Sequence, residues 1–127
     1  MFLTLVSTKT PAVFFLDKPI DSARFMKLLS CCFFIRTNSP DTCFINSDLI
    51  DPDQNLFNGK RSKILSICHL HSAKMEQKNN FRNNDINALR QVVPQKNIHS
   101  FRIWITDAEG SFLDFKEKEA FFEIELN

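Results

Sequence analysis

Apolar and polar residues alternate most clearly near the two ends of the chain. Residues 2–6 alternate Phe, Thr and Val with two leucines, and residues 122–126 alternate Phe, Ile and Leu with Glu123 and Glu125. Successive side chains of a strand point to opposite faces, so this period predicts a strand in each place. The final strand is expected to bury one face and to expose its two glutamates along a sheet edge, where charge discourages aggregation.

Four more segments are predicted to be strands, each bounded by turn-forming or polar residues. Residues 24–35 are apolar on both parities after Lys27, which is typical of a strand that is buried on both faces. The other three are residues 13–16, 43–50 and 63–70.

A hairpin is predicted near the C-terminal end. Residues 101–106 alternate, residues 107–110 have turn chemistry, and residues 111–115 return. Trp104 shares the polar parity of the first strand with Arg102 and Thr106, opposite the main apolar face. A large aromatic in that position indicates either a second packed layer or an interface anchor.

The stretch at about residues 72–97 is polar, rich in Asn and Lys, and is predicted to be an irregular connection with one helical turn at 85–90. Elsewhere, strands recur with polar turns between them. We therefore expect residues 1–127 to form a single all-β domain, an antiparallel sandwich or barrel.

Composition excludes several classes of function. Sixteen basic and fifteen acidic side chains leave a net charge of +1, so neither nucleic acid nor a membrane surface is an expected partner. Two glycines are too few for a phosphate-binding loop, and no apolar run approaches the length of a membrane span. Four cysteines without a disulfide-framework spacing indicate a reducing, intracellular location, in the cytoplasm or the nucleus.

Catalytic and metal chemistry finds little support in the cysteines and histidines. Cys68, His69 and His71 supply possible zinc ligands, but these cysteines lie in apolar strands rather than in short knuckles. Alternation sends Cys68 and His69 to opposite faces, which excludes a local nucleophile and base. A pairing of Cys43 with His99 stays open at this level. We expect a protein that is not an enzyme and that needs no cofactor, metal or small molecule.

Three stretches, in this order, carry a resemblance to a known family. They are Phe15-Leu-Asp-Lys-Pro-Ile20 followed by Lys27-Leu-Leu-Ser-Cys31; Cys43-Phe-Ile-Asn-Ser-Asp-Leu-Ile-Asp-Pro52 leading to Asn55-Leu-Phe-Asn-Gly-Lys60; and Ile98-His-Ser-Phe-Arg-Ile-Trp-Ile-Thr-Asp107 to Asp114-Phe115 and a Phe-Glu-Ile-Glu-Leu end. This pattern resembles the penton-type minor capsid proteins of Polinton/Maverick elements, which are self-synthesising DNA transposons of animal genomes related to adintoviruses. The resemblance covers most of residues 1–70 and 96–127.

The resemblance implies a single jelly roll whose copies form a ring of five at capsid vertices and meet a major capsid protein at their edges. Trp104, Phe115 and Arg102, with the edge strands, would carry the contacts, and the protein would enter a virion where the element is active. In the family, further strands follow the Lys-Leu-Leu-Ser-Cys segment, whereas here only residues 32–42 intervene. The resemblance therefore predicts an incomplete jelly roll, which is either a minor capsid protein of such an element or a truncated copy that has lost its function. The alternative is a monomeric β-sandwich binding module that uses the loops at one end.

Overall fold

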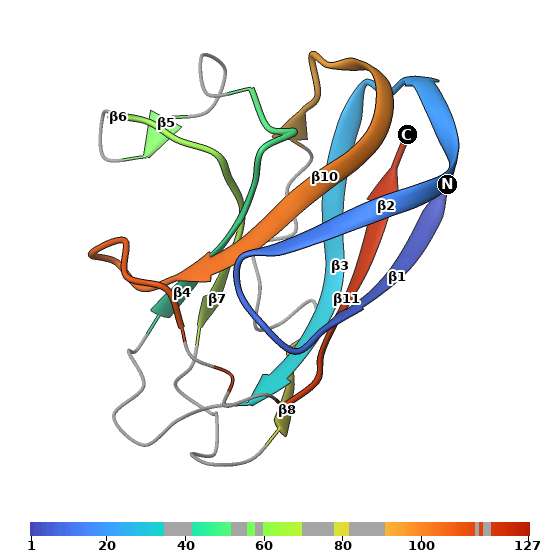
Figure 1. Ribbon diagram of the computed structural model, residues 1–127. Coiled ribbons are helices and arrows are strands. Elements are labelled where there is room, and N and C mark those ends of the chain that lie inside the picture. The colour runs from blue at the N-terminus through green and yellow to red at the C-terminus, as the bar shows by residue number, and fades with distance from the viewer. Residues whose placement is uncertain are drawn as a thin grey trace.

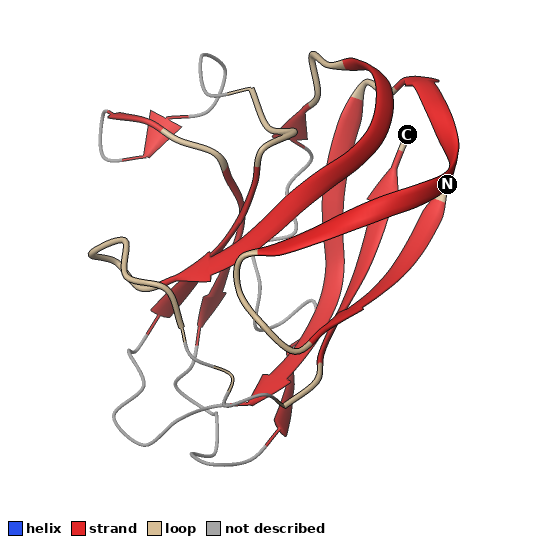
Figure 2. Ribbon diagram, viewed as in Figure 1, coloured by secondary structure: helices blue, strands red, loops and turns tan. Residues whose placement is uncertain are grey.

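The regular structure of the chain is entirely β-strand in the part that can be described (Figure 2). A computed structural model describes residues 1–34, 42–51, 56–57, 60–69, 78–81, 91–113, 115 and 118–127. Within these ranges there is no helix that could cross a membrane. Two antiparallel sheets pack against each other, which confirms the all-β antiparallel sandwich predicted from the sequence.

The first sheet, sheet A, places strands from both ends of the chain side by side. Its order is β1 (Phe2–Ser7), β11 (Ala120–Leu126), β3 (Phe25–Phe34) and β8 (Lys78–Phe81). The short strand β9 (Gln91–Val92) pairs with the beginning of β3, on the edge that β8 occupies further along. The last strand thus lies inside the sheet, not at an edge as its two glutamates suggested.

The second sheet, sheet B, has the order β2 (Ala12–Ser22), β10 (Lys96–Thr106), β4 (Thr42–Ser47) and β7 (Ile64–His69). Figure 1 shows it as the layer that faces sheet A. A separate pair of two-residue strands, β5 (Leu56–Phe57) and β6 (Lys60–Arg61), stands beside it.

This strand order is that of a single jelly roll. Consecutive main strands alternate between the two sheets, except for β4 and β7, which are neighbours in sheet B. Eight strands in two sheets of four define the jelly-roll architecture. The structure therefore differs from the expected loss of middle strands: each sheet has its four positions occupied, and only the outer position beside β3 is shared by two short strands.

Two local predictions need correction. The segment at 72–97, expected to be irregular, contains β8, β9 and the beginning of β10, whereas the helical turn predicted at 85–90 lies outside the described residues. The predicted hairpin keeps its turn, but among the described residues its return consists of a Thr106–Phe112 bridge and two hydrogen bonds of 3.0 Å, from Asp107 N to Ser111 O and from Leu113 N to Ile105 O. Strand β10 pairs instead with β2 on one side and with β4 on the other, because two long ladders make more favourable cross-strand side-chain pairs than one short return.

Large aromatic and aliphatic side chains fill the space between the sheets. Phe33, Phe101 and Phe122 are the largest side chains that are at most 2% exposed. The rings of Phe14 and Phe101 lie 5.9 Å apart, so β2 and β10 contact each other through their inner faces as well as through their ladder.

Candidate interaction surfaces

The outer face of sheet B is built from the side chains of β10 that point away from the core. Phe101 and Ile103 are 1% exposed and point inward, whereas Arg102 is exposed and Trp104 is half-buried. The alternation is that of the sequence prediction, so Trp104 lies on the face opposite the core. Main-chain N–H of Arg102 donates to Asp48 Oδ1 at 2.8 Å, which fixes the end of β4 against this strand.

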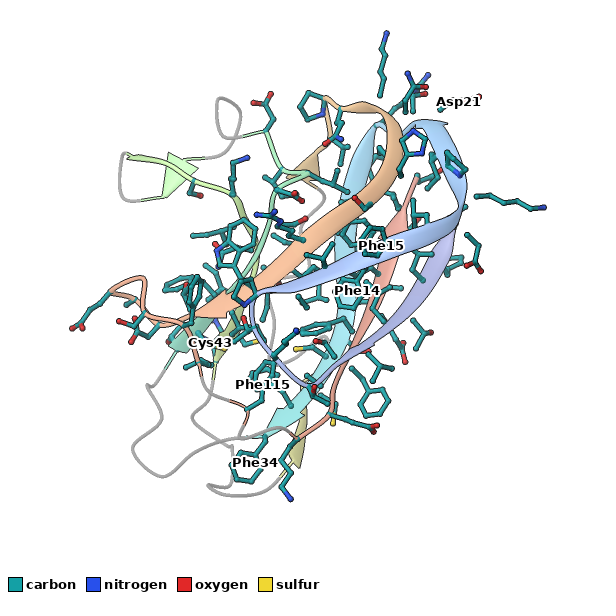
Figure 3. All side chains as sticks on the ribbon, in the orientation of Figure 1. Phe14, Phe15, Asp21, Phe34, Cys43 and Phe115 are labelled. Carbon is teal, nitrogen blue, oxygen red and sulfur yellow. The ribbon has the colours of Figure 1, made fainter. Side chains whose placement is uncertain are left out.

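The edge strand β2 extends this face with exposed apolar side chains. Val13 lies opposite Arg102 and Phe15 lies opposite Ser100 in the ladder. Val13 is 48% exposed and Phe15 is 80% exposed; Figure 3 shows Phe15 on β2. Single exposed apolar residues are ordinary, whereas a group of them next to an aromatic side chain is a candidate interaction site. We call Val13, Phe15, Arg102 and Trp104 the outer sheet-B surface.

A cavity of about 370 Å³ lies next to Trp104 on the same side of the sandwich. Its floor is formed by Phe44 and Asn46 of β4, and its walls include Ile64 and the turn at residues 107–110. Phe44 and Asn46 face outward yet are only 6% and 8% exposed, because Trp104 and this turn surround them.

Two polar side chains of this cavity already form hydrogen bonds within the protein. Asn46 Nδ2 donates to Phe44 O at 3.1 Å, to Trp104 O at 3.3 Å and to Thr106 Oγ1 at 3.3 Å. Asp107 Oδ1 accepts from the main-chain N–H of Glu109 at 2.9 Å and of Ser111 at 3.0 Å. What the cavity offers a ligand is therefore mainly the indole ring and apolar carbon, which suits an apolar side chain better than a polar small molecule.

The sequence placed three residues at an interface, and the structure separates them. Trp104 and Arg102 are neighbours on the outer sheet-B surface. Phe115 is 3% exposed, and its ring centroid lies 5.8 Å from that of Phe33 in the core (Figure 3). The contact role predicted for Phe115 is thus corrected to a packing role, since its side chain belongs to the core between the sheets and not to an outer face.

A cluster of three thiols in the core was not foreseen from the sequence. Cys43 of β4 lies opposite Cys68 of β7, and Cys31 of β3 reaches Cys68 from the other sheet with its Sγ at 3.5 Å. The hydrogen bond to Cys68, the burial of Cys43 and the charge of Cys68 raise the pKa of the Cys43 thiol well above its ordinary value. Such a thiol stays protonated and behaves as a small apolar side chain.

The sulfur and imidazole groups do not assemble into a catalytic or metal centre in the described part of the chain. Cys68 is fully buried and His69 is exposed, as their opposite parities predict. Cys43 is buried whereas His99 is exposed, so His99 is not placed to act as a base for the Cys43 thiol. Among the described residues, no group of three or more Cys, His, Asp or Glu side chains, the three core thiols included, is arranged so that it could hold a metal ion.

No model of a known protein family, no curated protein and no solved structure matches this chain.

Proposed function

We propose that this chain is a non-enzymatic structural protein of capsid type, a penton-like minor capsid protein of a Polinton/Maverick element. It works by associating with copies of itself in a ring of five and with a major capsid partner. The jelly-roll strand order is the observation that carries the proposal, because it is the fold that the resemblance implies.

A closed ring needs two different surfaces on every copy, since each subunit meets its two neighbours in different ways. The outer sheet-B surface supplies one of them, with Phe15 and Trp104 as its apolar members. The outer face of sheet A supplies a second, where Phe2 is 73% exposed and Val6 is 47% exposed. Tryptophan is among the residues that contribute most to protein interfaces, so Trp104 is the expected anchor.

The protein's single tryptophan makes this proposal directly testable. Light scattering is expected to give five times the 14.8 kDa mass of one chain, and dilution is expected to shift the Trp104 emission to longer wavelength as the indole meets water. Trp104→Ala should raise the dissociation constant of the ring at least about thirtyfold, the equivalent of about 2 kcal/mol. His99→Ala, which removes an exposed side chain of the same strand, is the matched control.

Two results would contradict the proposal: a monomer at every concentration, or a Trp104→Ala variant that assembles as the native chain does. Circular dichroism of the variant shows whether its fold is retained, so that loss of assembly is not mistaken for unfolding.

A second candidate function, a monomeric binding module, is favoured by the cavity beside Trp104. In that case the native chain is a monomer, and an apolar peptide or small molecule quenches or shifts the Trp104 emission in a saturable way. Asn46 and Asp107 use their polar atoms in hydrogen bonds within the protein, so the cavity favours an apolar occupant. Because ligand sites usually offer a few polar groups that give specificity, we rank this function second.

A further inference from the structure

Strand β1 has one edge that pairs with β11 and one edge beside which the structure describes no strand. Leu126 N donates to Met1 O at 2.9 Å, which makes Met1 and Leu126 a hydrogen-bonded pair of this antiparallel ladder. Such pairs alternate with non-hydrogen-bonded ones, and the register along β1 is uninterrupted. The next hydrogen-bonded pairs therefore involve Leu3 and Leu5.

The other residues of β1 direct their main-chain groups the opposite way. Phe2, Thr4 and Val6 lie at the non-hydrogen-bonded positions opposite β11, so their N–H and C=O groups point to the unpaired edge. All three side chains are exposed, with Phe2 at 73% and Val6 at 47%. An edge of this kind is a template for another strand.

The two neighbouring edges of the sandwich are protected to very different degrees. The segment Phe2–Ser7 contains no charged residue and no proline. By contrast, the edge strand β2 contains Asp17, Lys18, Pro19 and Asp21. Charges and proline on an edge strand prevent pairing with other chains, so β2 is closed to strand addition and β1 is open.

The exposed sequence of β1 is complementary to itself. In an antiparallel pairing of two copies centred on Thr4, Thr4 lies opposite Thr4 and Phe2 lies opposite Val6 at both ends. These three positions are the ones whose main-chain groups are available, and each pair exchanges two hydrogen bonds. Threonine pairs and pairs of an aromatic with a β-branched residue are favourable across strands, and no like charges meet.

We infer that two copies of this chain associate through β1, joining their two A sheets into one continuous antiparallel sheet. The contact is two-fold symmetric and uses the same surface of both copies, so it closes on itself. It does not depend on the capsid ring, which needs two different surfaces. We assign the partner strand to a second copy of this chain because the pairing centred on Thr4 satisfies the N–H and C=O groups of Phe2, Thr4 and Val6.

Thr4→Pro is the decisive variant. The N–H of Thr4 has no role in the ladder to β11, so proline removes no hydrogen bond of this ladder, while it deletes a donor from the central pair of the dimer. In the Trp104→Ala background, which weakens the ring of five, light scattering should find the chain passing from twice the 14.8 kDa chain mass to the monomer on dilution. In that background Thr4→Pro should raise the dissociation constant of the dimer at least about tenfold, whereas the matched control Thr4→Val should leave it unchanged.

Hydrogen exchange gives a second readout that does not depend on any variant. The amides of Thr4 and Val6 should be protected at high protein concentration and exposed after dilution, while those of Leu3 and Leu5 should be protected throughout. Amides of Thr4 and Val6 that exchange equally fast at both concentrations overturn the inference, as does a Thr4→Pro variant that dimerises normally. A five-copy ring in which the amides of Thr4 and Val6 stay unprotected would support the capsid proposal and refute this inference. A native chain that is no more than a dimer, and that stays a dimer in Trp104→Ala, would support this inference and refute the capsid proposal.

Discussion

Replacing Phe115 by alanine separates a packing role from a contact role more sharply than any other substitution in this chain. The side chain is 3% exposed and its ring lies 5.8 Å from that of Phe33. Truncation of a buried phenylalanine to alanine costs about 3–5 kcal/mol, through lost burial and the cavity that remains. The free energy of unfolding of a folded domain is about 5–15 kcal/mol, so this change removes a large part of the stability.

The measurement is urea unfolding followed by the fluorescence of Trp104. With a denaturant dependence of about 2 kcal/mol per molar, the midpoint should fall by about 1.5–2.5 M. Phe112→Ala is the matched control: Phe112 belongs to the same segment and is 57% exposed, so its loss should change stability by less than about 1 kcal/mol. A Phe115→Ala variant of native stability that no longer assembles would refute the core placement and restore the contact role that the sequence suggested.

Three further outcomes are expected. Because the pKa of the Cys43 thiol is raised in the folded state, this thiol loses its proton at a lower pH in the unfolded chain than in the folded one. The free energy of unfolding should therefore decline as pH rises above about 9, by up to about 1.4 kcal/mol per pH unit. This slope should shrink in Cys43→Ala, and a native stability independent of pH between about 9 and 11 would contradict the reasoning. In thiol labelling of the native protein, half-buried Cys32 should react well before Cys43, and equal rates would show that the core opens easily. Gly110 has φ of 88°, so Gly110→Ala should cost about 1 kcal/mol in thermal unfolding and Gly110→Asn less, whereas equal stability of all three proteins would argue against this turn conformation.

Strands with one solvent-exposed face and one buried face were predictable, since apolar and polar residues alternate within the strand's own sequence. The segments of β1 and β11 were recognised as strands for this reason, although β11 lies inside its sheet and not at the predicted edge. Strand β8, with the sequence KNNF, has no such pattern, because an edge strand is held by main-chain hydrogen bonds to one neighbour and needs little from its side chains. It was accordingly assigned to a connection.

Contacts between distant parts of the chain were harder to foresee. The parity of Trp104 and Arg102 on β10 fixed their common face, and the structure places them there. Phe115 follows a turn and belongs to no strand, so parity says nothing of its direction. The thiol contact between Cys31 and Cys68 joins residues 37 positions apart on different sheets, and only the packing of the two layers brings them together.

The sulfur contact at the centre of the sandwich has a consequence for how this fold tolerates its chemical surroundings. All four cysteines are thiols, and the 3.5 Å between Cys31 Sγ and Cys68 Sγ is well beyond the roughly 2.05 Å of a disulfide. At this point the two layers are therefore joined by packing and a weak thiol hydrogen bond, without a covalent link. A strong reductant has no covalent bond to break here, and the melting temperature should be the same with and without it.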